Sequence, residues 1–500
     1  MKTKISTSFK PQLYTSFAGL NTSRSDVSME RPEAQPFVEL DNVYCANTGY
    51  LTNEPTIGSI LGSKNSVTHI RLLSSESNVA VYATDSDQGV SINTLNRPYS
   101  VANAWPARSV VSSTLFDGKA ILAGGGRYLY SFDGFEYLKI ESEAISGGRY
   151  VVQIQDRLAV AGFDSNPNEI VLSRISNPTI FHTEEDVAEA SLLKAARFNV
   201  QNLIGNGDRI RGITSFENNK FAVFTGDRVL VYLADQDFNN WTLDTRLVVR
   251  YGTLSHNSIV SVGDEVFFCS KSGIHSLRRS ALNGTTVYTN PLSEDVQELY
   301  QNLLALVSDQ RNVNAHFNPD DGRLHVFFPV NTNLAYRLSG VLSSSKQEGD
   351  VTKIKWSVSK YANAQCGDYL AGRHYYGAPT GIYQVGRWYD NTLTRGPGYA
   401  LTPILWHKDL FNPKQGLMLV IYASGAGTLF VDAEDETGRK LGTYEFVMPD
   451  QDEASYAGVP LQRQFTRPFS HSYTGVRLRI RFEASKMIRL FGLGILTKEQ

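Results

Sequence analysis

The stretch Phe116-Asp-Gly-Lys-Ala-Ile-Leu-Ala-Gly124, followed by Tyr128-Leu-Tyr-Ser-Phe132, sets the pattern of the chain. Polar turn residues lead into an apolar strand, and a second apolar strand rich in tyrosine follows. Asp-Gly between such runs is a strong signal for a two-residue β-hairpin turn. Similar units return at Gln155–Gly162, Asn218–Tyr232, Gly263–Ile274, Asp321–Tyr336 and Gly367–Tyr383, with a weaker one at Asn78–Tyr82.

Hairpins that return about every 40–60 residues are typical of the blades of a β-propeller. Each blade is a small sheet that cannot bury both faces alone, and neighbouring blades cover one another. The sequence therefore predicts an all-β fold with a propeller of six blades at residues 65–395. Residues 1–64 are polar and irregular and are expected to form an N-terminal arm with short strands.

The rhythm changes after Gly398. About seven short strand-like runs, separated by turn signals, predict a C-terminal β-sandwich at residues 396–500. Helix is expected only in inserts. Pro291–Val307 has a potential capping serine, two acidic residues in its first turn and apolar residues at i, i+3, i+4 and i+7 spacing. Glu184–Val200 is expected to hold a short helix, and Ser343–Asp350 is expected to be a flexible loop.

The composition excludes several classes of protein. The 500 residues carry a formal net charge of -2, so no overall basic field attracts nucleic acid or membrane. Three cysteines far apart in the sequence predict neither a disulfide framework nor a zinc motif, and they favour a reducing compartment. Neither a signal-peptide h-region nor a run of 18 apolar residues occurs, so we expect no membrane-spanning segment.

Motifs that carry chemistry are missing from the local sequence. The nine histidines form no HxH or HxxxH pair, and Gly124–Gly126 lacks the spacing of a phosphate loop. Asp85–Gly89 departs from the calcium-loop pattern at two positions, and Asp432–Glu436 is most simply an exposed hairpin tip. We therefore expect no catalytic, cofactor-binding or metal-binding residues and no cofactor. Carboxylates that meet from different blades would leave no local trace.

One charged pattern is more specific. Val476-Arg-Leu-Arg-Ile-Arg-Phe482 alternates strictly, which places Arg477, Arg479 and Arg481 on one face of a strand and the apolar residues on the other. This arginine face is either simply solvated or a contact surface for an acidic partner or for DNA phosphates. Both interpretations stay open, and we treat the three arginines as candidate interface residues.

The order of several weak motifs resembles the tail nozzle proteins of short-tailed bacteriophages, also called tail hub or packaged-DNA stabilisation proteins. The resemblance touches most of the chain and rests on Gly19–Ser23, Pro32–Ala34, Leu40–Val43, Gly49–Pro55, Gly212–Phe216, Phe221–Phe224, Tyr251–Ser255, Val266–Phe268, the Pro291–Val307 helix, Leu401–Leu405, Gly475–Ile480 and Gly492–Ile495. The N-terminal arm is longer and more polar than is usual for the family.

The resemblance implies a structural virion protein rather than an enzyme. It implies a six-fold homohexameric ring below the tail adaptor and portal, beside tail fibre, spike or needle proteins. The subunit would be made in the host cytoplasm. Double-stranded DNA would pass along the ring axis without sequence-specific contacts, be retained there before ejection and be released at ejection. In such a ring, Ser343, Lys346, Glu348 and Asp350 are candidate channel or contact residues, as is the insert Glu184–Gly207.

Two alternatives from other classes stay open. One is a propeller-type glycosidase or polysaccharide lyase that acts on host surface sugars. The other is a propeller scaffold that binds proteins.

Overall fold

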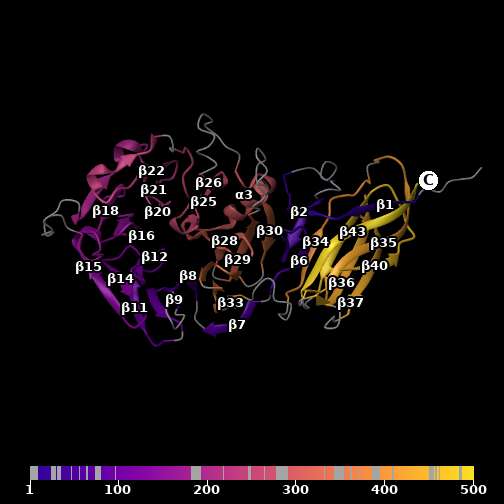
Figure 1. Ribbon diagram of the computed structural model, residues 1–500, viewed down its shortest axis with the longest axis horizontal. Coiled ribbons are helices and arrows are strands. Elements are labelled where there is room, and N and C mark those ends of the chain that lie inside the picture. Colours follow the sequence, from indigo (N-terminus) through magenta and orange to yellow (C-terminus); the bar gives the residue numbers. More distant parts are fainter. Residues whose placement is uncertain are drawn as a thin grey trace, which may run out of the picture.

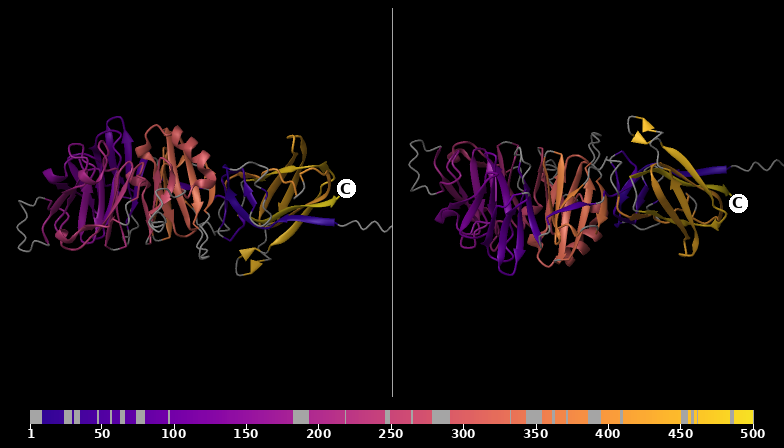
Figure 2. Two further views of the ribbon diagram at one scale, coloured as in Figure 1. Left: turned by 90° about the horizontal axis from the view of Figure 1, so that it is seen from above. Right: turned by 90° about the horizontal axis from the view of Figure 1, so that it is seen from below.

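The computed structural model is elongated, with a propeller at one end and a β-sandwich at the other (Figures 1 and 2). With 56% strand and 8% helix, the predicted all-β fold is confirmed. The structure describes residues 9–23, 30, 35–46, 48–55, 57–62, 66–73, 80–95, 97–181, 193–217, 219–245, 249–263, 265–277, 291–331, 333–342, 354–360, 363–370, 372–385, 395–407, 410–449, 455–456, 459–460, 462–483 and 487–499.

Six small antiparallel sheets form the blades of the propeller. Five of them follow one another along the chain: β8–β11 (Val67–Leu72, Ala80–Ser86, Gly89–Thr94, Ser100–Trp105), β12–β15 (Ser112–Phe116, Lys119–Ala123, Tyr128–Phe132, Tyr137–Glu141), β16–β19 (Tyr150–Ile154, Arg157–Ala161, Glu169–Leu172, Ala196–Asn199), β20–β23 (Gly212–Phe216, Lys220–Phe224, Val229–Leu233, Thr242–Leu243) and β24–β26 (Val260–Val262, Glu265–Ser270, Gly273–Ser276). The sixth contains β31 (Cys366–Leu370), β32 (Arg373–Ala378), β33 (Gly381–Val385) and β7 (Ile57–Gly62).

The blades stand side by side around one axis (Figure 1). Their first strands touch in turn, β12 with β16 and β16 with β20, and β31 touches β8 to complete the circle. These six small sheets, arranged as propeller blades, confirm the prediction. The hairpin at Asp321–Tyr336 does not lie in one of these small sheets. It belongs to one end of a larger sheet, and that end stands in the same circle between β24–β26 and β31–β33. Of the weaker unit predicted at Asn78–Tyr82, residues 80–82 are described, and they form the beginning of strand β9.

The hairpin with the Asp117-Gly118 turn forms as its sequence predicts. Phe116 pairs with Lys119, and the two residues between them, Asp117 and Gly118, both have positive φ, at 50° and 71°. Two successive positive φ values are those of a type I′ turn, whose twist matches that of the strands that it joins. Asp-Gly is therefore a local determinant of this blade.

The first 64 residues contribute short strands to several sheets. The strands are β1 (Phe9–Tyr14), β2 (Phe17–Leu20), β3 (Gln35–Phe37), β4 (Glu39–Asp41), β5 (Val43–Cys45), β6 (Leu51–Asn53) and β7. Strand β7 pairs with β33 and so closes the propeller with a segment that precedes it in the sequence. Strands β1 and β6 pair with the last strand of the chain.

A nine-stranded sheet joins the propeller to the C-terminal region. Its order is β27 (Asn314–Asn318), β28 (Arg323–Asn331), β29 (Leu334–Val341), β30 (Lys355–Ser359), β4, β34 (Gly398–Leu401), β42 (Val476–Phe482), β36 (Gly427–Asp435) and β37 (Lys440–Met448). Strand β4 is the link, because it pairs with β30 on one side and β34 on the other.

A second sheet packs against the C-terminal half of this sheet and makes a sandwich (Figure 2). Its order is β40 (Arg463–Pro468), β35 (Lys414–Gly425), β43 (Ile488–Glu499), β6 and β5, with β1 paired to β43 and β41 (Ser472–Tyr473) to β35. A small hairpin, β38 (Ser455–Tyr456) and β39 (Val459–Pro460), is separate.

Helix occupies short segments, as expected. The predicted Pro291–Val307 helix is confirmed as η7 (Glu294–Val296) and α3 (Gln297–Leu306), although the Ser293 hydroxyl accepts from the Ile274 N–H and not from a helical N–H. In the Glu184–Val200 insert, residues 184–192 lie outside the described residues, and Ala196 is in strand β19 rather than in a helix. The other short helical turns are η1 (Glu143–Ile145), η3 (Gln201–Leu203), η4 (Phe238–Asn240), η6 (His256–Ser258) and η8 (Gln310–Asn312).

Within the described ranges, no helix has the length and apolar character needed to cross a membrane.

One apolar core runs through the junction of the two regions. It begins at α3 and β28, passes the fully buried Trp356 of β30, and continues between the two sheets of the sandwich. Gly19, with φ at 94°, lies against β30, where an added Cβ would come within 2.9 Å of the Trp356 backbone nitrogen. The N-terminal Gly19-Leu-Asn-Thr22 segment is thus packed onto the propeller side of the junction, and the Asn21 side chain donates to Asp295 before α3.

Candidate functional site

The candidate interface arginines lie as predicted on one face of β42. Arg477, Arg479 and Arg481 are half-buried, and the four apolar residues between and beside them are buried. The neighbouring strand β36 pairs with β42 so that Asp432 stands opposite Arg479 and Glu434 opposite Arg477. The acidic run therefore lies beside the arginines in one sheet, and the two do not form separate patches of opposite charge.

Contacts within the chain already engage part of this arginine face. Arg481 Nε donates to Asp432 Oδ2 at 2.6 Å, and its guanidinium lies over the Phe430 ring. The guanidinium of Arg479 lies 5.2 Å from the centre of the Tyr399 ring. Burial alone would raise the pKa of Asp432, but hydrogen bonds from Arg481 and Thr443 hold it below its ordinary value. The side chains are thus ordered by neighbours and still half-exposed.

The candidate channel or contact residues cannot be located. Ser343, Lys346, Glu348 and Asp350 all fall outside the residues that the structure describes. The described part of the Glu184–Gly207 insert, residues 193–207, contains β19 and η3. Strand β19 is the last strand of its blade, paired to β18 alone among the described strands.

A cavity of about 400 Å³ opens where loops of successive blades meet. Its described lining comes from segments between β11 and η8, and it includes four arginines and one carboxylate, Arg108, Arg149, Arg209, Arg311 and Asp164. The carboxylate is held by two hydrogen bonds of 2.7 Å from Arg149. Because guanidinium groups outnumber carboxylates, this cavity favours an anionic group over a cation.

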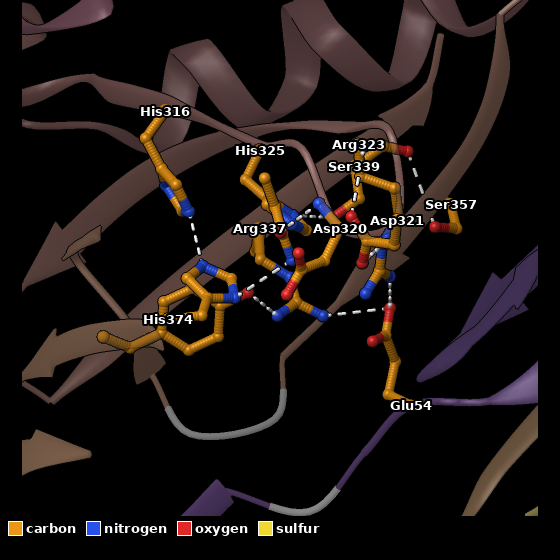
Figure 3. Close-up of polar contacts among 12 residues, drawn as sticks. Glu54, His316, Asp320, Asp321, Arg323, His325, Arg337, Ser339, Ser357 and His374 are labelled. Atoms are coloured by element: carbon orange, nitrogen blue, oxygen red, sulfur yellow. Dashed lines mark hydrogen bonds and ion pairs between the residues drawn. The ribbon is translucent and has the colours of Figure 1, made fainter. Parts of the chain in front are cut away.

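A fully buried ionic cluster lies on the propeller side of the junction (Figure 3). Glu54, from the segment between β6 and β7, accepts from Arg323 at 2.6 Å and lies 3.0 Å from Arg337. Arg323 also donates to Asp321 at 2.6 Å, and Arg337 donates to the Tyr376 hydroxyl at 2.6 Å. Burial alone would raise the pKa of Glu54, but the two guanidinium groups hold it below its ordinary value.

Three buried histidines lie beside this cluster, where Figure 3 shows them converging from different strands. His316 is on β27, His325 stands opposite it on β28, and His374 is on β32 of the sixth blade. One ring nitrogen of each lies within 4.8 Å of those of the other two. The Nε2 atoms of His316 and His374 are 2.5 Å apart.

Two nitrogens of these histidines are buried without a hydrogen-bond partner, Nδ1 of His316 and Nε2 of His325. An unsatisfied buried polar atom costs about 1–3 kcal/mol, so it is uncommon in a protein core. Burial, followed by the nearby Arg337 and Arg323, lowers the pKa of His316 to about 3. The same causes lower the pKa values of His325 and His374. The three imidazoles are therefore neutral at pH 7.

The sequence does not reveal this cluster, because its members are 9 and 49 residues apart along the chain. His316 and His325 meet through the register of a hairpin, and His374 meets them through the packing of neighbouring blades. The sequence does carry one signal: His325 stands among the apolar residues of Asp321–Phe328, in a strand that is expected to be buried. The expectation of no metal-binding residues rested on local spacing alone.

Comparisons with known proteins give likenesses of fold only. No protein-family model matches the chain, and no curated protein matches it. Among solved structures, BamB from Moraxella catarrhalis is 12% identical, with a TM-score of 0.39 over 70% of this chain and 92% of that chain. The extracellular domain of BT4673 from B. thetaiotaomicron is 10% identical, with a TM-score of 0.41 over 80% and 48%. YCF48 from Cyanidioschyzon merolae is 11% identical, with a TM-score of 0.35 over 66% and 98%. Likenesses this distant carry no argument about function.

Proposed function

We propose that this chain is a structural subunit of the tail nozzle of a short-tailed bacteriophage. Six copies form a ring below the adaptor, and the ring continues the DNA conduit, retains the packaged genome and passes it at ejection. The subunit belongs to the virion and contacts adaptor or portal-proximal proteins and a fibre, spike or needle. The proposal rests on the order of the sequence motifs that resemble this family, read together with the architecture.

The observation that supports it best is the nine-stranded sheet. One end of this sheet stands in the circle of blades and the other end lies in the sandwich, and one apolar core runs past both. The two regions are therefore packed against each other. A conduit under the pressure of packaged DNA needs a subunit that transmits force between its upper and lower contacts. Domains joined by a small polar interface would instead be expected to move relative to one another.

The cavity between the blades supports a structural role over sugar hydrolysis. Glycoside hydrolysis normally uses two carboxylates that flank the scissile bond. Among the described residues that line the cavity, Asp164 is the single carboxylate, and it is bound by Arg149. We therefore propose that the chain is not an enzyme.

The test is the mass and shape of the assembled protein. We would measure the full chain by native mass spectrometry and electron microscopy, alone and after co-expression with the portal and adaptor of the same phage. We expect a six-fold ring, or a monomer that forms such a ring on the adaptor. A monomer under both conditions would overturn the proposal, and turnover of a capsule polysaccharide would favour the enzyme.

A further inference from the structure

We propose that His316, His325 and His374 bind one transition-metal ion of the zinc class. The site goes beyond the proposed function, and it would fasten the nine-stranded sheet to the sixth blade. Three observations carry the proposal: the convergence of three buried imidazoles, the His325 ring nitrogen that has no partner, and the hydrogen-bond partners that hold the other ring nitrogens of His325 and His374.

The geometry lies close to that of a bound ion. Zinc–nitrogen bonds of about 2.0–2.1 Å in a tetrahedral site place two ligand nitrogens about 3.3 Å apart. The Nε2 atoms of His316 and His374 are 2.5 Å apart, and one nitrogen of each of the three rings lies within 4.8 Å of the others. Spreading the first pair by about 0.8 Å and drawing His325 inward by up to about 1.5 Å produces the site.

Hydrogen-bond partners hold two of the three rings. His325 Nδ1 lies 2.8 Å from the Ser339 hydroxyl. A proton on that nitrogen leaves the Nε2 lone pair, which has no other partner, for a metal. His374 Nδ1 lies 3.3 Å from the Asn318 amide. The proton between the two Nε2 atoms can move to this nitrogen, with the amide turned so that its oxygen accepts.

The backbone makes room for the third ring. A Cβ at Gly367 would lie 2.6 Å from Cε1 and 2.8 Å from Nδ1 of His316. No side chain fits at this position without displacing the imidazole, although the φ of Gly367 is not in the left-handed region. Glycine on β31 is thus matched to the histidine on β27, the strand that β31 contacts.

The donor atoms select the kind of ion. Neutral imidazole nitrogen suits zinc, cobalt, nickel and copper, whereas magnesium and calcium need oxygen ligands. The neighbouring charges cancel, since Arg323 and Arg337 are matched by Glu54 and Asp321.

The place of the site gives it a mechanical role. His316 and His325 belong to the sheet that continues into the sandwich, and His374 belongs to the blade that β7 closes. An ion held by all three would cross-link these two sheets at the closure of the propeller. A metal that binds only the folded chain adds to its stability in proportion to its affinity.

The experiment measures metal in the full chain, purified with an affinity tag that contains no histidine. Protein from zinc-supplemented cells should hold about one zinc per chain by mass spectrometry of the elements. The metal-free protein, given Co²⁺ alone, should show the strong visible absorption of tetrahedral cobalt. Zinc should raise the melting temperature.

Matched variants separate ligands from other histidines. His325→Gln and His374→Gln should abolish the cobalt absorption, and Ser339→Ala should weaken binding about 10- to 100-fold while all three ligands remain. The control His69→Gln changes a buried histidine on β8, and this variant should bind metal as the wild type does. If wild-type protein with a native circular dichroism spectrum takes up neither metal, or if Ser339→Ala and both ligand variants bind as tightly as wild type, the proposal is wrong.

Discussion

The blades away from the junction and the junction sheet are built from the same kind of hairpin. Their apolar side chains are buried in different ways. Phe221 of blade β20–β23 packs in a core shared with the adjacent blade β16–β19. Trp356 of the junction packs in a core that extends from α3 to the last strand of the chain. The blade core joins residues close in sequence, whereas the junction core joins the two ends of the chain. Contacts between distant segments form slowly, so we infer that the junction completes folding after the blades.

The largest expected effect comes from breaking the buried ionic cluster. Glu54→Gln would take away the carboxylate of Arg337 and leave Arg323 with Asp321 alone. Removing one partner of a buried pair costs about 3–5 kcal/mol. The control Glu141→Gln breaks the ion pair with Arg127, whose side chains are 54% and 70% exposed. This exposed pair should matter by about 0–1 kcal/mol. Urea unfolding of both variants gives the comparison, and equal costs would contradict it.

Trp356→Ala tests whether the junction unites the two regions. Removing a buried large aromatic side chain costs about 3–5 kcal/mol, and Phe221→Ala in blade β20–β23, away from the junction, should cost a similar amount. The two substitutions should increase hydrogen exchange in different parts of the chain. In hydrogen exchange, Trp356→Ala should speed exchange in both β28 and β42, because they share one core. Phe221→Ala should act on blades β16–β19 and β20–β23 alone. If β42 keeps its wild-type protection in Trp356→Ala, the two regions do not form one unit.

The blades could be predicted from the sequence, and the junction could not. The blades are predictable because Asp117-Gly118 and similar turns fix hairpins locally, and α3 because its apolar spacing is local too. The junction is not, because β4 is three residues long and is defined by partners more than 300 residues away. The histidine cluster is hidden for the same reason, since neither hairpin register nor blade packing leaves a motif.

Acidification should destabilise the contacts between blades, by less than the core substitutions do and by more than a change at the arginine face does. His69 is on β8, with Nε2 2.7 Å from the hydroxyl of Ser113 on β12, and burial lowers its pKa to about 3. The unfolded chain, with a pKa of about 6.5, therefore binds more protons. The contribution is fully present above about pH 6.5 and is lost as the pH falls toward about 3.

The expected loss is about 2 kcal/mol at pH 5 for each such histidine. Urea unfolding at pH 7.5 and pH 5, with a chelator present, measures it. His69→Phe should lose less stability on acidification than the wild type, and the His316, His325 and His374 cluster should account for a larger share because all three pKa values are lowered. The same pH dependence in His69→Phe and wild type would contradict the assignment.

The smallest effect on stability is expected at the arginine face of the sandwich. Arg477→Glu, Arg479→Glu and Arg481→Glu together remove the Arg481–Asp432 pair, in which the Arg481 side chain is 42% exposed. An exposed pair is worth about 0–1 kcal/mol, and the buried apolar face of β42 is unchanged. We expect the triple variant to keep a folded propeller and a melting temperature near that of the wild type.

Assembly should respond more strongly than stability. The change places three carboxylates beside Asp432 and Glu434 of the adjacent strand, and this reverses the charge that the face presents to a neighbouring subunit or to a docking partner. Charges at a rim set register and encounter rate more than affinity, so the wild-type interaction should weaken as salt rises. Asp432→Asn, which releases Arg481 but keeps all three arginines, is the matched control and should assemble. Normal rings and full infectivity of the triple variant at physiological salt would mean that this face is only solvated.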